Sequence, residues 1–185
     1  IKEGLQRSDV LGVDETNLRV SRRQDWIHVS SSDRLTFLAY HRKRGTAAIE
    51  EVGILPGYEG VCVHDGFTAY DRYDGCQHGL CNAHLLRELN YVIETTEPEW
   101  ARRMKELLLE IKAAVDCARE SGKFSLSSRC RQDFQSRFDA IIEEAKTLYG
   151  ALMRKRRRRT QRLIVPESPL RMAGRKLAAR LEAKK

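Results

Sequence analysis

The chain has 185 residues, of which 41% are hydrophobic and 32% are charged, a composition typical of a soluble globular protein and not of a disordered one. Lysine and arginine outnumber aspartate and glutamate by 34 to 26, and the resulting net charge of +8 favours an anionic partner, most often nucleic acid. No apolar run approaches the roughly 20 residues that span a bilayer, and no signal-peptide pattern opens the chain, so we expect no membrane partner.

The first 40 residues predict three strands joined by short polar turns. The first covers residues 9–20 and is expected to break at Asp14-Glu15-Thr16, where polar residues interrupt the apolar pattern. The second covers residues 26–29 and the third residues 35–40, both rich in the residue types that favour sheets. Three consecutive strands with short connections most simply form an antiparallel meander.

A crossover is predicted next. Thr46 is the expected N-cap of a helix that runs to Val52, and a fourth strand, Val61–His64, follows. A helix at this point lets the fourth strand lie parallel to the first. A short helix over residues 67–73, a strand over 77–81 and a helix over 83–94 complete the order β-β-β-α-β-α-β-α. This is the order of an RNase H-like mixed α/β sheet, in which strands one and four are central neighbours.

The second half of the chain changes character, because apolar residues recur at helical spacing over residues 97–120 and again over 127–149. The short segment between them predicts an antiparallel helical hairpin in which both stripes serve packing. Pro166 and Pro169 mark a break before a last basic helix over residues 170–183. We therefore predict a core over residues 1–95, a helical insertion over 96–165 and a final basic helix within 166–185.

Two aspartates follow the strands that this order makes neighbours, Asp14 after the first and Asp65 after the fourth. A carboxylate at the end of a buried strand is costly unless something uses it, and ligands of open α/β sheets gather at the carboxyl ends of strands. If the two converge, they form a hard-oxygen site suited to Mg²⁺ or Mn²⁺. Alternatively, each caps a turn. We interpret Glu15 and Asp71 as solvent-facing, with Glu15 turned away from Asp14 by strand alternation.

Soft ligands form a weaker pattern. Cys76, Cys81 and His84 have C-x₄-C-x₂-H spacing and could hold a structural Zn²⁺, although there is no CxxC pair and simple packing of Cys81 is the alternative. The five cysteines show no secreted framework and indicate reduced cytosolic thiols.

Basic residues supply candidate DNA contacts. Arg87 is expected on the outer side of its helix, where it either meets a phosphate or is solvated or salt-bridged. A basic run without acids could neutralise several DNA phosphates, with a solvated loop as the alternative. The run consists of Arg154, Lys155, Arg156, Arg157, Arg158, Arg159 and Arg162.

Five phrases occur in the order found in one protein family. They are Val-Asp-Glu-Thr at residues 13–16, Trp-Ile-His-Val at 26–29, Arg-Gly at 44–45, Val-His-Asp-Gly-Phe-Thr-Ala-Tyr at 63–70 and Leu-Cys-Asn-Ala-His-Leu-Leu-Arg-Glu-Leu at 80–89. In these phrases the chain resembles the transposases of the insertion-sequence sixty-six group, a bacterial branch of the DDE transposases. The resemblance is close over residues 9–95 and looser beyond.

The resemblance implies the RNase H-like catalytic core of a DNA transposase, with a helical insertion before its last catalytic helix. It assigns the first two acids of the catalytic triad to Asp14 and Asp65, and it implies a two-ion Mg²⁺ or Mn²⁺ site for phosphodiester hydrolysis and strand transfer. Cys81 and His84 match a Cys-x-x-His element of the family. The implied partner is double-stranded DNA, as transposon ends and target, in the bacterial cytoplasm at the nucleoid, and a homo-oligomer is allowed.

The third acid of the family is a glutamate in an Asn-Asn-x-x-Glu-Arg phrase, which this sequence lacks. We therefore expect a truncated gene copy or a fragment of a longer chain, with weak or no strand-transfer activity alone. Two other hypotheses stay open, a non-catalytic DNA-binding remnant and a zinc-stabilised interaction domain.

Overall fold

The computed structural model describes residues 1–96 and 98–159, and the chain divides after Cys81 into two compact units. The predicted limits at residues 95 and 165 differ from this division and stay predictions. The predicted last helix, over residues 170–183, lies outside the described residues. Among the helices that are described, none combines the length and the apolar character needed to cross a bilayer.

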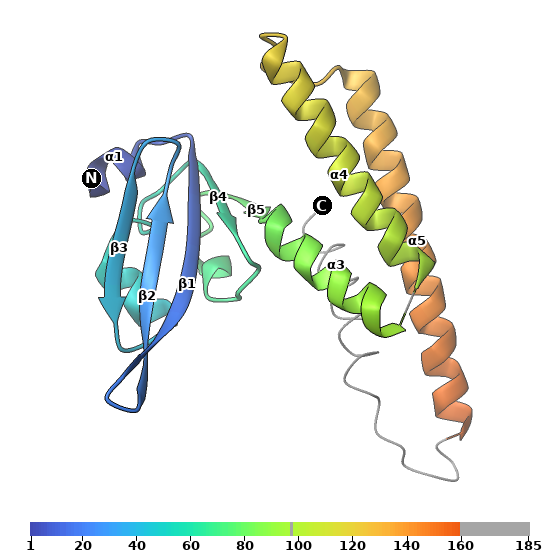
Figure 1. The fold of residues 1–185 in the computed structure, drawn as a ribbon, viewed down its shortest axis with the longest axis horizontal. Helices are drawn as coiled ribbons and strands as arrows, with labels where there is room; N and C mark the ends of the chain where they lie inside the picture. The colour runs from blue at the N-terminus through green and yellow to red at the C-terminus, as the bar shows by residue number, and fades with distance from the viewer. Residues whose placement is uncertain (97, 160–185) are drawn as a thin grey trace. The chain divides into compact units, whose positions relative to one another are not determined.

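The first unit is built on a five-stranded mixed sheet with the order β3-β2-β1-β4-β5 (Figure 1). Its strands are β1 (Val10–Val20), β2 (Arg23–Ser31), β3 (Thr36–His41), β4 (Val61–His64) and β5 (Gln77–Leu80). Strands β1, β2 and β3 form the predicted antiparallel meander, and β4 lies parallel to both β1 and β5. The prediction of a mixed α/β architecture with parallel first and fourth strands is therefore confirmed.

Strand β1 differs from the prediction, because it runs without a break through Asp14, Glu15 and Thr16. The physical reason is its pairing with β2, which continues from Gly12↔Ser31 to Val20↔Arg23 and satisfies the backbone groups of the polar segment. The expected interruption was wrong.

The helices of this unit also differ in detail. Helix α2 (Thr46–Val52) ends at the predicted residue but begins one residue earlier than predicted, because its N-cap is Gly45 and not Thr46. It is followed by Gly53, whose φ of 67° is left-handed. The short helix predicted over residues 67–73 is a single 3₁₀ turn, η1 (Tyr70–Arg72). A further helix, α1 (Lys2–Gln6), was not predicted, although its Leu5 is fully buried.

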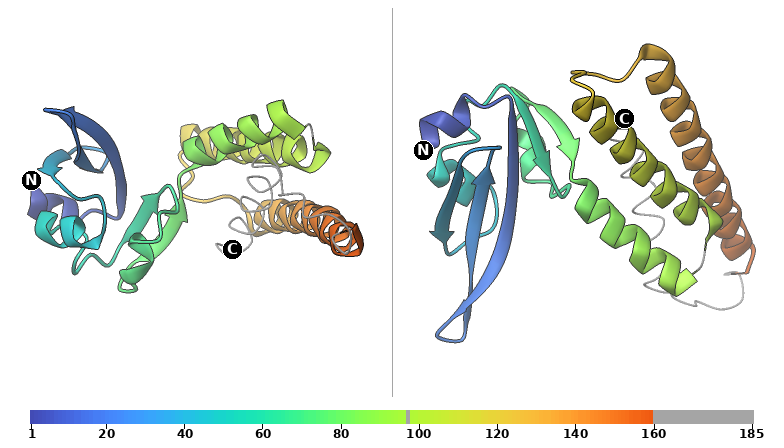
Figure 2. Two further views of the ribbon diagram at one scale, coloured as in Figure 1. Left: turned by 90° about the horizontal axis from the view of Figure 1, so that it is seen from below. Right: turned by 45° about the horizontal axis from the view of Figure 1, so that its top comes forward.

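The core of this unit lies on one face of the sheet, and α1 and α2 both pack there (Figure 2). The side chains that fill it come from alternate strand positions, from the two helices and from the loops that follow α2 and β4. They are Leu5, Leu11, Val13, Ile49, Val52, Ile54, Leu55, Tyr58, Cys62, Tyr70 and Cys76. On the sheet's other face, β3 leaves Leu38 and Tyr40 exposed.

The second unit consists of α3 (Asn82–Thr96), α4 (Glu99–Glu120) and α5 (Ser128–Arg159), and α4 packs against both of the others. Ion pairs join Arg103 to Glu144 and Arg137 to Glu110, which confirms that α4 and α5 run antiparallel. The predicted apolar stripes supply the buried contacts of both helices, including Trp100, Met104, Leu107, Phe134, Ile141 and Ile142.

Candidate functional site

The two predicted acids lie at the same edge of the sheet. The parallel pairing of β1 with β4 ends at Gly12↔Val63, and Asp14 and Asp65 each follow that pair by two residues. Asp14 is exposed, and the side chain of Asp65 is 23% exposed, so both carboxylates are accessible to a ligand. The fold thus brings the backbones of the two residues together, while a metal shared between them stays a prediction.

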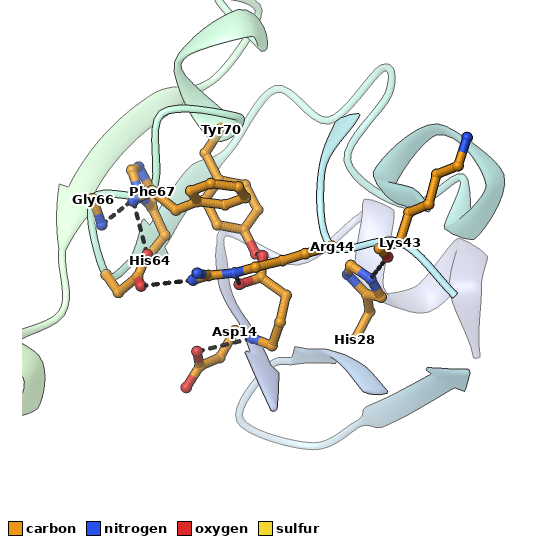
Figure 3. Close-up of polar contacts among 10 residues, drawn as sticks. Asp14, His28, Lys43, Arg44, His64, Gly66, Phe67 and Tyr70 are labelled. Carbon is orange, nitrogen blue, oxygen red and sulfur yellow. Dashed lines mark hydrogen bonds and ion pairs between the residues drawn. The ribbon is translucent and has the colours of Figure 1, made fainter. Parts of the chain in front are cut away.

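Backbone amides orient both carboxylates. The amide of Glu15 donates to Oδ1 of Asp14 at 2.8 Å, and the amide of Phe67 donates to Oδ1 of Asp65 at 2.8 Å (Figure 3). The second bond closes a tight turn in which Gly66 has a φ of 87°. Such a turn needs Asp and Gly in succession, since the aspartate side chain bonds to the backbone two residues on and glycine accepts positive φ.

Glu15 is buried, so its interpretation as a solvent-facing acid was wrong. Alternation along β1 turns it away from Asp14, as expected, but onto the face that also carries Leu11 and Val13 and is covered by the helices. Its side chain is 0% exposed. The hydroxyl of Tyr70 donates to Oε1 of Glu15, and Nε of Arg44 donates to Oε2 at 3.2 Å. These bonds compensate the cost of burying a charge.

Arg44 links this buried acid to the predicted site. Besides its bond to Glu15, it donates from Nη2 to Oδ2 of Asp65 at 3.4 Å. Its guanidinium lies 4.2 Å from the centre of the Phe67 ring and 5.2 Å from that of Trp26. Lys43, the residue before Arg44, is bonded to β2: Nε2 of the buried His28 donates to the Lys43 carbonyl at 3.1 Å. This bond holds the segment that carries Arg44 against the sheet.

The sequence identified Arg44 only as part of the Arg-Gly phrase at residues 44–45, and this bridge was not predicted. One feature of the sequence indicated it: residues 11, 13 and 15 of a strand lie on the same face, so Glu15 shares a face with the apolar Leu11 and Val13. An acid on an apolar face requires a buried cation or hydroxyl nearby. The same surroundings act on Tyr70, whose pKa is raised first by burial and then by the charge of Glu15.

The predicted soft ligands are arranged differently from the proposal for Cys76, Cys81 and His84. The sulfur of Cys76 lies with Cys62 and His78 in a group whose ligand atoms are all within 4.8 Å of one another. Cys81 is not in that group, and His84 belongs to the second unit. Burial, and secondly the neighbouring Cys76, raises the pKa of the Cys62 thiol to about 12.

The predicted DNA contacts lie in the second unit. Arg87 is exposed, as expected, and its Nε donates to the carbonyl of Ala83 in its own helix at 3.3 Å. Residues 154–159 belong to the C-terminal part of α5, while Arg162 lies outside the described residues. Phosphate binding by these residues stays a prediction.

Comparisons with known proteins identify a protein family that the chain matches. A family profile described as "Transposase IS66 family" matches residues 1–182, well beyond the segment of close resemblance. No curated protein matches the chain. A solved structure of the simian T-cell lymphotropic virus intasome in complex with PP2A regulatory subunit B56 gamma is similar with 9% identity and a TM-score of 0.31. That match covers 47% of this chain and 41% of the other, and a similarity of this size supports no conclusion about this chain.

Proposed function

The chain belongs to the transposase IS66 family, and on that premise we propose that residues 1–81 form the first part of an RNase H-like catalytic core that cuts and joins DNA. The observation that carries the proposal is the position of Asp14 and Asp65, each two residues beyond the same parallel strand pair. Three observations support this location of the site: the family to which the chain belongs, the order of the strands, and the positions of the two acids at one edge of the sheet. Both acids lie there although they are far apart in sequence.

The side chains at this edge fit Mg²⁺ or Mn²⁺ in kind, because both ions prefer carboxylate oxygens. Bound there, such ions would activate the attacking oxygen and stabilise the departing oxygen of a phosphodiester. Asp14 offers an exposed carboxylate beside the strand end. Asp65 offers a carboxylate that the Phe67 amide holds in orientation, so little conformational entropy is lost on binding.

Arg44 has a separate role in this proposal. Its guanidinium partly neutralises Asp65 and Glu15 in the metal-free chain, which keeps the Asp65 side chain in place before a cation arrives. A divalent cation at Asp65 competes with Arg44 for the same oxygen, Oδ2. Arg44 keeps its bond to Glu15 and its contact with Phe67 when it gives up that oxygen, so the exchange costs little structure.

DNA is the proposed partner, and the net charge of +8 supports it. The basic residues from Arg154 to Arg162 and the exposed Arg87 are proposed to contact phosphates and so to position the duplex without reading its sequence. The proposed core lacks the third acid of the triad, so we propose that this chain alone has weak or no strand-transfer activity.

Metal binding tests the site directly and does not depend on turnover. We expect Mn²⁺ bound to the purified chain to be detected by electron paramagnetic resonance and to be lost in Asp14→Asn and in Asp65→Asn. Asp33→Asn is the matched control, since Asp33 is 80% exposed in the turn between β2 and β3. Equal Mn²⁺ affinity in all three variants would show that the two acids do not share an ion.

A DNA assay separates a catalytic core from a non-catalytic remnant. On supercoiled plasmid with Mn²⁺, Asp65→Asn should abolish any nicking while leaving the DNA affinity and its salt dependence unchanged. Nicking that survives this substitution contradicts the assignment of Asp65. A turnover comparable with that of a complete family member contradicts the prediction of weak activity.

A further inference from the structure

We propose that Cys62, Cys76 and His78 bind one Zn²⁺ ion inside the first unit, at a site separate from the carboxylates of Asp14 and Asp65. The ligand atoms of the three residues all lie within 4.8 Å of one another. Cys62 is fully buried, Cys76 is 8% exposed and His78 is partly buried. Thiols and imidazoles are the ligand types that zinc sites in proteins use, and a set of two thiols and one imidazole leaves the fourth tetrahedral position open to water or a further ligand.

The sheet itself brings these residues together. Cys62 on β4 is paired with His78 on β5, and partners in neighbouring parallel strands project to the same face. Cys76 precedes β5 by one residue and lies two positions from His78, so it points to that face as well. Its sulfur is 3.8 Å from Nε2 of His78. The site therefore joins the segment that enters β5 to the neighbouring strand.

The spacing of the ligand atoms suits a tetrahedral ion. With Zn–S bonds of about 2.3 Å and Zn–N bonds of about 2.0 Å, ligand atoms around zinc lie roughly 3.5–3.8 Å apart. The distance of 3.8 Å from Sγ of Cys76 to Nε2 of His78 lies at the upper end of this range, and the limit of 4.8 Å for the whole group requires a contraction of about 1.3 Å at most. Thiolate ligands disfavour Mg²⁺ and Mn²⁺, so this site and the carboxylates select different ions.

A second histidine holds the imidazole of His78. The amide of Gly66 donates to Nδ1 of His64 at 3.1 Å, so that nitrogen carries no proton and Nε2 does. Nε2 of His64 lies 3.0 Å from Nδ1 of His78 and donates to it. The proton of His78 is then on Nε2, which donates to the carbonyl of Tyr73 at 3.0 Å.

Zinc binding reverses this order of protons. The ion takes the place of the proton on Nε2 of His78. That proton moves to Nδ1 of His78, which then donates a hydrogen bond to Nε2 of His64. His64 in turn carries its proton on Nδ1 and loses the bond from Gly66, while the thiols of Cys62 and Cys76 release two protons to solvent. Gly66 directly follows Asp65, so occupation of the zinc site alters the turn that orients the catalytic carboxylate.

Cobalt and zinc titrations of the full chain test the proposal. After the chain has been stripped with EDTA, Co²⁺ should produce cobalt–thiolate charge-transfer absorption at one ion per chain, and Zn²⁺ should abolish it. Cys62→Ser and Cys76→Ser should lose this absorption. Cys117→Ser is the matched control, because Cys117 is exposed on α4 in the other unit, and it should bind as the unchanged chain does.

Further variants decide between ligand sets and guard against misfolding. His78→Ala, at a partly buried position, should lower zinc affinity by more than the roughly 10- to 100-fold that loss of an outer hydrogen-bond partner such as His64 costs. Far-ultraviolet circular dichroism of each variant shows that it is folded. Absorption that survives in folded His78→Ala and Cys62→Ser overturns the proposal. Its loss in both Cys76→Ser and Cys81→Ser but not in Cys62→Ser also overturns it and would indicate the set Cys76, Cys81 and His84. Failure of Mn²⁺ binding leaves this test unaffected, since the two sites share no ligand.

Discussion

Replacing Arg44 by alanine tests how strongly the buried Glu15 depends on its guanidinium partner. Removing one member of a buried ion pair costs about 3–5 kcal/mol, because the remaining charge is left uncompensated. Arg44 is 36% exposed, and solvent screening reduces this to about 2–3 kcal/mol. Loss of the stacking on Phe67 adds about 0.5–1 kcal/mol. We therefore expect Arg44→Ala to lower the free energy of unfolding of the first unit by about 3 kcal/mol.

Urea denaturation followed by tryptophan fluorescence measures this loss. The chain has two tryptophans, and a Trp100→Phe background leaves Trp26 on β2 as a reporter of the first unit. Arg34→Ala is the matched control, because Arg34 is 86% exposed and its partner Asp33 is 80% exposed, so the expected loss is below about 0.5 kcal/mol.

A second substitution separates charge from packing. In Arg44→Ala with Glu15→Gln, the uncompensated carboxylate is gone, so part of the lost stability should return as a coupling energy of about 1–2 kcal/mol. Equal losses in Arg44→Ala and Arg34→Ala, together with no recovery in the double variant, would refute the interpretation of Glu15 as a buried partnered acid.

Three further predictions concern close packing and pH. Gly60→Ala should cost about 1–3 kcal/mol in urea denaturation, because an added Cβ would lie 2.8 Å from a backbone oxygen, whereas Gly45→Ala meets no atom within 4 Å; equal costs would contradict this packing. Cys62 retains its proton to a pH of about 12 when folded and loses it above about 9 when unfolded, so its contribution to stability is complete below pH 9 and falls as the pH rises. With EDTA present, Cys62→Ala should flatten that fall by up to about 1.4 kcal/mol per pH unit, and an unchanged slope would exclude a titrating buried thiol. Ile142→Ala, at a fully buried position of α5, should lower the free energy of unfolding of the second unit by about 2–5 kcal/mol in thermal melting. Leu148→Ala should lower it far less, because Leu148 is 42% exposed. Similar melting of both variants would argue against the α4–α5 packing.

The sequence was sufficient for the features that depend on local periodicity and connection length. Apolar residues at helical spacing predicted the paired helices α4 and α5, since a helix that packs on one side repeats its apolar positions with the turn. The helix Thr46–Val52 between the third and fourth strands predicted that β4 lies parallel to β1, because a parallel connection needs a crossover. The same reasoning put Asp14 and Asp65 at one edge of the sheet.

Tertiary structure alone decided which partners each polar residue meets. Alternation showed that Glu15 and Asp14 face opposite ways, but only the packing of α1 and α2 determined that the face of Glu15 is the buried one, where it needs Arg44 and Tyr70. Likewise, spacing along the chain grouped Cys76 with Cys81, whereas the register of β4 against β5 placed it with Cys62 and His78. The physical reason is the same in both cases. Burial and ligand geometry depend on which strand or helix lies next to a residue, and the local sequence does not specify a neighbour that is distant along the chain.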